Sequence, residues 1–146
     1  MLKKGEKAPD FSLPDEMGET HNLSDYEGKW TLLYFYPKDD TPGCTKEACA
    51  IRDSAMEYEK MDVEVLGISK DSIESHEDFI SKYKLPFTLL SDKNKKVIKM
   101  YGADGGITTK RISYLIDPDG MIAKAYSKVD PEKHAEEVLA DVETLR

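Results

Sequence analysis

The sequence predicts an α/β domain in which helices flank a central mixed β-sheet, with a β-hairpin ahead of the sheet. Residues 30–36 and 63–69 have the pattern of buried strands, and each run is followed by a helical stretch. That order is typical of βαβ units with parallel strands. Farther along, residues 112–117 and 121–126 flank a Pro-Asp-Gly turn signal and predict an antiparallel pair.

The strands are predicted from β-favouring runs bounded by turn residues. Residues 11–13 and 20–23, on either side of a turn at Met17-Gly18, predict the N-terminal hairpin, and a turn or short helical turn follows. The next run, residues 30–36, contains only apolar or β-favouring side chains, which suits a strand buried on both faces. Residues 87–90 predict a third short strand of the sheet.

Four helices are predicted between and after these strands. Helix signals are Pro at a first helical position, small polar caps and apolar residues at helical spacing. The predicted spans are Pro42 to about Lys60, Asp71 or Ser72 to about Tyr83, Lys93 to Tyr101, and Pro131 to the end of the chain. The complete order predicts a thioredoxin-like fold.

Length and charge narrow the function classes. A chain of 146 residues suits one domain, residues 1–146. Its formal charge is 21 − 29 = −8, which argues against a nucleic-acid partner. No apolar run approaches the roughly 20 residues of a membrane span, and no apolar signal segment follows the N-terminus. We therefore expect a cytoplasmic protein, in a compartment that keeps thiols reduced.

The two cysteines, Cys44 and Cys49, lie close together at the start of the first predicted helix. Thr41 suits the N-cap and Pro42 suits the first helical position, so Cys44 falls in the first turn. Free backbone N–H groups and the positive end of the helix dipole point there. Both favour a thiolate, which is the nucleophilic form of cysteine.

The five-residue spacing between Cys44 and Cys49 makes a mechanical prediction. On a straight helix it corresponds to Cα atoms about 8–9 Å apart. A disulfide needs Cα atoms within about 7 Å. If the two cysteines pair, the first turn or more of the helix must therefore unwind.

Other interpretations of the cysteines remain open on residues alone. Both could be inert core residues, because buried cysteine is common. A zinc site is disfavoured, since two cysteines are too few and the three histidines lack ligand spacing. The Cys-x-x-Cys motif of dithiol oxidoreductases is absent, and no local signature of a Cys–His hydrolase is present.

The segment from Pro37 to Cys49 resembles the active-site signature of peroxiredoxins, Pro-x-x-x-Thr-x-x-Cys. Its continuation, Thr-x-Glu-Ala-Cys, resembles the Q-type branch, also called bacterioferritin comigratory proteins. The resemblance covers nearly the whole chain. Further matching segments are residues 8–14, 66–69, 87–92 and 111–117.

The resemblance implies a role for each matching residue. Cys44 matches the peroxidatic cysteine and Cys49 the resolving cysteine. Thr41 matches the threonine that hydrogen-bonds the thiolate and the peroxide, and Arg111 matches the arginine that stabilises the developing charge. Two further matches are the shielding proline, at Pro37, and a glutamate of the Q-type motif, at Glu47, which we expect close to Cys44.

The resemblance also implies an activity and partners. It implies a thiol-dependent peroxidase that reduces hydrogen peroxide and alkyl hydroperoxides, forms an intrachain Cys44–Cys49 disulfide, and is recycled by thioredoxin or a similar dithiol. No cofactor or metal is implied. Since the disulfide lies within one chain, we expect a monomer. An alternative is a thiol-based redox sensor or chaperone-like binding protein that uses the same cysteine pair.

Overall fold

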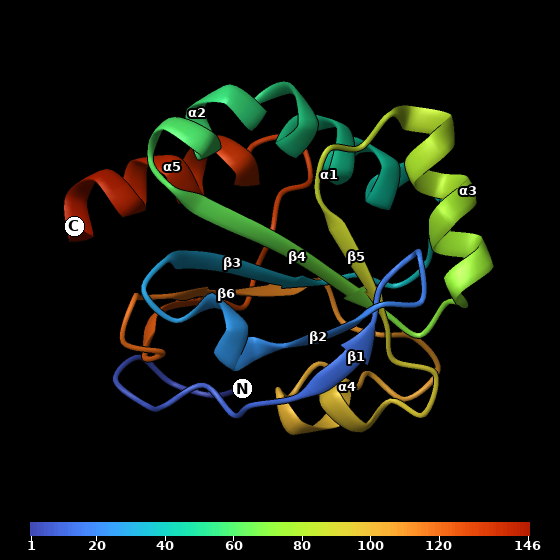
Figure 1. The fold of residues 1–146 in the computed structure, drawn as a ribbon, viewed down its shortest axis with the longest axis horizontal. Helices are drawn as coiled ribbons and strands as arrows, with labels where there is room; N and C mark the ends of the chain where they lie inside the picture. Colours follow the sequence, from blue (N-terminus) through green and yellow to red (C-terminus); the bar gives the residue numbers. More distant parts are fainter.

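A five-stranded mixed sheet runs through the middle of the protein (Figure 1) in a computed structural model that describes all 146 residues. Its strands lie in the order β5-β4-β3-β6-β7, and a separate hairpin pairs β1 with β2. Strands β3, β4 and β5 are parallel, β6 is antiparallel to β3, and β7 is antiparallel to β6. The strand bounds are β1 Ser12–Pro14, β2 Thr20–Asn22, β3 Trp30–Phe35, β4 Val63–Ser69, β5 Thr88–Ser91, β6 Ile112–Ile116 and β7 Ile122–Tyr126.

The helices divide between the two faces of the sheet. Helices α1, α2, α3 and α5 cover one face, and the β1–β2 hairpin lies with α4 on the other (Figure 1). None of these helices has the length and apolar character needed to cross a membrane. The helix bounds are α1 Pro42–Asp53, α2 Ala55–Lys60, α3 Ile73–Tyr83, α4 Lys96–Met100 and α5 His134–Leu145, with a 3-10 turn, η1, at Leu23–Tyr26.

Strand β3 shows why the central run carries apolar or β-favouring side chains throughout. Leu33 and Phe35 belong to the buried cluster under the hairpin, whereas Leu32 and Tyr34 belong to the cluster under α1, α3 and α5. Successive side chains of a strand point to opposite faces, so a strand covered on both faces buries nearly every side chain, Thr31 included. The predicted thioredoxin-like fold with a mixed sheet and an N-terminal hairpin is confirmed.

The first predicted helix differs from the structure because it is interrupted at Ser54. Ser54 leaves helical geometry (φ −101°, ψ 11°), and its N–H donates back to Ile51 O at 3.1 Å. The next helix starts from this residue, where Tyr58 N–H donates to Ser54 O at 3.1 Å. The bend lets Tyr58 of α2 donate its hydroxyl to Ala135 O (2.9 Å), a tertiary contact that overrides helix continuity. The last helix also begins later than predicted, at His134 instead of Pro131.

Candidate active site

Cys44 lies at the carboxyl end of β3, in the first turn of α1. Residues 36–41 connect the two elements, and we call the last five of them the 37–41 loop. Thr41 occupies the N-cap position with extended backbone (φ −96°, ψ 156°), and Thr45 N–H donates to Thr41 O at 2.8 Å. Cys44 is only 2% exposed, and both cysteines carry free thiols. The predicted placement of Cys44 at a helix N-terminus is therefore confirmed.

Sheet register places Arg111 beside Cys44. Phe35, the last residue of β3, pairs with Ile112, the first residue of antiparallel β6. Arg111 precedes Ile112 and so lies just beyond the end of β3, where α1 begins. Its Nη2 donates to Cys44 Sγ at 3.3 Å. The guanidinium and the helix N-terminus together stabilise negative charge on that sulfur.

Glu47, one helical turn after Cys44, is fully buried and forms the other half of this arrangement. Arg111 Nη1 donates to Glu47 Oε1 at 2.8 Å, while Glu47 Oε2 has no hydrogen-bond partner. Burial raises the pKa of Glu47 to about 7, although the charge and hydrogen bond of Arg111 oppose the rise. We call Cys44, Glu47 and Arg111 the Arg111 network. It brings together three of the six predicted site residues.

The charges of this network shift the pKa values of Arg111 and of the nearby Tyr34. Burial opposes the charge on Arg111, but negative charge on Cys44 and Glu47 holds the pKa of Arg111 above its ordinary value. The hydroxyl of Tyr34 is buried without a hydrogen-bond partner. Burial, followed by the charges of Glu47 and Cys44, raises the pKa of Tyr34 well above its usual range. Tyr34 therefore stays neutral.

The remaining three predicted residues do not contact Cys44 through a side-chain hydrogen bond. The Thr41 hydroxyl donates to Lys38 O at 2.8 Å, so it neither caps α1 nor reaches the sulfur in this conformation. Pro37 follows the end of β3 and is partly exposed. Cys49 is also partly exposed, on the same unbroken helix as Cys44.

Gly43 is a site residue that the sequence interpretation missed. A Cβ built at Gly43 would lie 2.9 Å from Arg111 Nη2, which is too close for real atoms. The absence of a side chain therefore lets the guanidinium approach the helix start. A glycine inside the first turn of a helix, where it weakens the helix, was the available signal.

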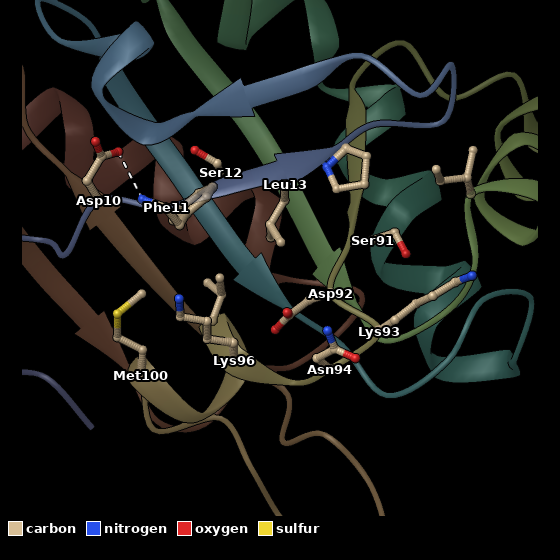
Figure 2. A pocket seen from close by; sticks show the side chains of 13 residues that line it. Asp10, Phe11, Ser12, Leu13, Ser91, Asp92, Lys93, Asn94, Lys96 and Met100 are labelled. Atoms are coloured by element: carbon tan, nitrogen blue, oxygen red, sulfur yellow. Dashed lines mark hydrogen bonds between the residues drawn. The ribbon is translucent and has the colours of Figure 1, made fainter.

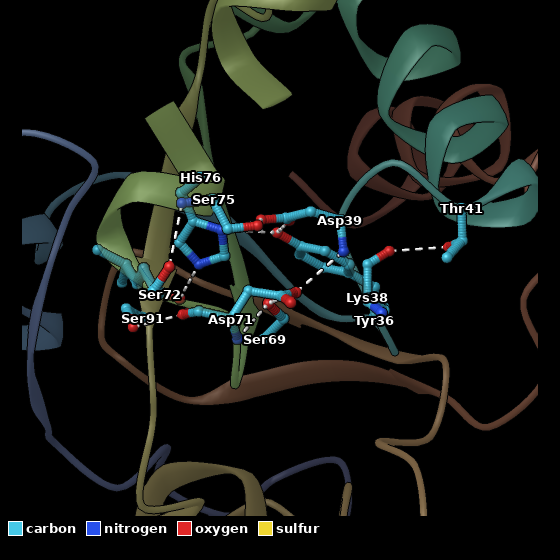
Figure 3. Close-up of polar contacts among 11 residues, drawn as sticks. Tyr36, Lys38, Asp39, Thr41, Ser69, Asp71, Ser72, Ser75, His76 and Ser91 are labelled. Carbon is cyan, nitrogen blue, oxygen red and sulfur yellow. Dashed lines mark hydrogen bonds and ion pairs between the residues drawn. The ribbon is translucent and has the colours of Figure 1, made fainter. Parts of the chain in front are cut away.

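A second buried cluster lies between the 37–41 loop and α3 (Figure 3). We call Tyr36, Asp39, Ser75 and His76 the Asp39 network. Ligand atoms of Asp39, Asp71 and His76 lie within 4.8 Å of one another, the spacing of a metal site. Each of these three groups is already hydrogen-bonded within the protein, so the cluster is a complete polar network whose groups do not need an ion.

A pocket of about 710 Å³ lies between the β1–β2 hairpin and α4 (Figure 2). Its polar lining mixes acidic, basic and neutral side chains, among them Asp10, Asp92, Lys93 and Lys96. None of the six predicted site residues lines it. The chemistry expected of the cysteines therefore belongs to the start of α1, not to this pocket.

Comparison with known proteins agrees with this site. The AhpC/TSA family matches residues 4–125. A putative peroxiredoxin bcp of Coxiella burnetii is 49% identical over 146 residues, covering 94% of this chain and 97% of the relative. The crystal structure of peroxidoxin BcpB from Mycobacterium tuberculosis has a TM-score of 0.92 at 33% identity, covering 100% of this chain and 99% of that one.

A third similarity bears on the reaction. A structure of the Xanthomonas campestris bacterioferritin comigratory protein, described for its alkyl peroxide reduction activity, has a TM-score of 0.86 at 30% identity. It covers 92% of this chain and 90% of that one. The chain therefore belongs to the AhpC/TSA family, within its peroxiredoxin Q (bcp) branch, and is a thiol-dependent peroxidase.

Proposed function

We propose that Cys44 is the peroxidatic cysteine of this enzyme and that hydrogen peroxide and alkyl hydroperoxides are its substrates. The observation that carries the proposal is the 3.3 Å contact from Arg111 Nη2 to a buried sulfur at a helix N-terminus. The Cys44 thiolate attacks one peroxide oxygen, an S–O bond forms and the O–O bond breaks. The departing alkoxide or hydroxide takes up a proton and leaves as alcohol or water, and Cys44 becomes a sulfenic acid.

Cys49 is the resolving cysteine in this proposal. Its thiolate attacks Cys44 Sγ, an S–S bond forms, and the hydroxide that leaves takes up a proton to become water. Since α1 is continuous from Pro42 to Asp53, the pair can form only after part of it unwinds. A dithiol protein, thioredoxin or similar, then reduces the disulfide by two electrons.

The remaining residues support the first step. Arg111 stabilises the thiolate and the charge that develops on the leaving oxygen. Glu47 holds one arm of the guanidinium and so orients the other arm toward Cys44. Thr41 reaches the peroxide by rotating its hydroxyl away from Lys38 O, and Pro37 shields the sulfur from water.

Assembly and location follow from the same cycle. Because both cysteines lie in one helix, a single chain can complete turnover, and we propose a monomer. A reducing compartment such as the cytoplasm would supply the dithiol. Light scattering after size-exclusion chromatography tests the monomer, and a dimer mass in both redox states would contradict it.

Cysteine variants test the proposed chemistry directly. We expect Cys44→Ser to abolish rapid peroxide consumption in stopped-flow assays. Cys49→Ser should react once and stall as a sulfenic acid. In the wild type, one equivalent of peroxide should yield a Cys44–Cys49 peptide that is lighter by two hydrogens in mass spectrometry. Unchanged thiol-dependent turnover in Cys44→Ser would disprove the assignment, and slow turnover with oxidation-dependent partner binding would favour a sensor.

A further inference from the structure

Two adjacent aspartates tie the 37–41 loop to the two ends of α3. Asp39 contacts the first turn of α3, where Ser75 Oγ donates to its Oδ2 at 2.8 Å. Asp40 contacts the last turn, where Lys82 Nζ and the Tyr83 hydroxyl each donate at 2.8 Å. The Asp40 contacts are exposed, whereas the Asp39 side chain is 4% exposed. Burial therefore makes the Asp39 attachment the stronger of the two.

Both carboxylate oxygens of Asp39 and its backbone N–H have hydrogen-bond partners. Its Oδ1 accepts from the Tyr36 hydroxyl at 2.6 Å, and its Oδ2 also lies 2.7 Å from His76 Nδ1. Its backbone N–H donates to Asp71 Oδ2 at 2.9 Å. These partners come from the end of β3, from α3 and from the segment before α3 (Figure 3).

His76 extends the attachment to the sheet. It is fully buried, and its Nε2 lies 3.1 Å from Leu90 O of β5. A carbonyl oxygen only accepts hydrogen bonds, so Nε2 carries a proton. On the other side of the ring, Nδ1 shares a proton with the carboxylate of Asp39. That carboxylate already accepts hydrogen bonds from the hydroxyl groups of Tyr36 and Ser75. The pair therefore links the loop, α3 and β5 through two contacts of the His76 ring, one to Asp39 and one to Leu90 O.

We propose that Asp39 and His76 are positioning residues for the peroxide reaction: they hold the 37–41 loop against α3 and β5 so that α1 starts where Arg111 meets Cys44. This inference rests on the proposed function of Cys44. It adds that the loop stays attached while α1 unwinds for the disulfide. Unwinding then begins after Thr41, and the peroxide-reactive geometry is restored from a fixed starting point.

Neighbouring variants test the attachment. Asp39→Ala should slow the reaction of the reduced protein with hydrogen peroxide by about tenfold or more, because small displacements of reacting groups cost rate steeply. Formation of the Cys44–Cys49 disulfide should not slow. Asp39→Asn, which can accept from Tyr36 and donate to His76, should recover most of the rate. Asp40→Asn is the matched control and should stay within about twofold of wild type, since it removes only the exposed ion pair with Lys82 and suits the left-handed backbone at this position (φ 56°).

Loss of stability must be separated from loss of position. Ile122→Ala empties a buried site on the opposite face of the sheet and should lower the melting temperature without changing the peroxide rate. The inference is overturned if folded Asp39→Ala reacts within twofold of wild type, or if Asp39→Asn recovers nothing.

Hydrogen exchange on the wild type keeps the test independent of variant folding. On oxidation, amides between Cys44 and Ala50 should lose protection, while the Asp39 amide should keep it. Equal loss at Asp39 and Thr45 would overturn the inference. A wild-type protein that fails to consume peroxide would instead refute the proposed function, and the protection of the Asp39 amide would still report on the attachment.

Discussion

Two buried polar networks flank the 37–41 loop, and they differ in how completely their hydrogen bonds are made. In the Asp39 network, both carboxylate oxygens and both ring nitrogens have partners within the protein. In the Arg111 network, Glu47 Oε2 has none, and the nearby Tyr34 hydroxyl has none either. Incomplete buried networks cost stability, whereas complete ones make their surroundings rigid.

The difference matches the two proposed roles: the Arg111 network surrounds the reacting sulfur, and the Asp39 network holds the 37–41 loop in place. In the proposed reaction Cys44 changes from thiolate to sulfenic acid, so the groups around it cannot be optimal for one state alone. The Asp39 network faces no such change and can be satisfied throughout the cycle. The predictions below test this division by altering the incomplete network, in decreasing order of expected effect.

The largest effect should come from removing the cation. Arg111→Met should lower the rate constant for peroxide reduction by about 10²–10³-fold, the usual loss when one charge-stabilising donor is removed. Arg111→Lys should recover only part of the rate, because lysine lacks the planar fork that serves Cys44 and Glu47 together. Stopped-flow peroxide consumption measures both. A rate within threefold of wild type in Arg111→Met would contradict the role of the guanidinium.

The second prediction concerns the cost of the buried carboxyl. Because burial raises the pKa of Glu47 from 4.5 to about 7, the folded protein binds this proton more tightly than the unfolded chain. The contribution of Glu47 to the free energy of unfolding should therefore fall as pH rises from 4.5 through 7. Glu47→Gln does not titrate there. Between about pH 4 and pH 8, its stability relative to wild type should improve by about 3 kcal/mol.

Urea unfolding of both proteins at several pH values measures the difference in their free energies of unfolding. The contributions of all other titrating groups are the same in both proteins and cancel in this difference. A constant difference across the range would show that Glu47 keeps an ordinary pKa. Glu47→Gln should also retain most of the peroxide rate, because its amide oxygen can still accept from Arg111 Nη1.

The smallest of the three effects should come from Gly43→Ala. The added methyl group meets Arg111 Nη2 at 2.9 Å, so the guanidinium must move by a few tenths of an ångström. We expect a loss of about tenfold in the peroxide rate, with Cys44 intact by thiol titration and the fold intact by circular dichroism. A crystal structure with Arg111 unmoved and the rate unchanged would show that the close approach is unimportant.

The fold was predictable because its signals are local. The apolar run at 30–36, the Pro-Asp-Gly turn and the spacing of helices and strands each lie within a few residues. The break at Ser54 was not predictable, because it depends on a contact between Tyr58 and Ala135, 77 residues apart. Local helix preference cannot register such a contact.

The candidate site divides in the same way. Cys44 and its helix start follow from Thr41-Pro42, and Arg111 was identified through family resemblance. The Asp39–His76 pair joins residues 37 positions apart on a loop and a helix. His76 has no metal-ligand spacing and Asp39 is one of many acidic residues, so only the folded arrangement distinguishes them from surface polar residues.

The interruption at Ser54 has a consequence for the speed of the catalytic cycle. Since Ser54 separates α1 from α2, α1 can melt alone in the proposed cycle, while Tyr58 keeps α2 docked on Ala135. Re-forming one short helix between two held ends takes on the order of a microsecond or less, by analogy with helix–coil relaxation. Thiol–disulfide exchange is far slower. The delay between successive turnovers should then depend on the supply of reductant and not on refolding.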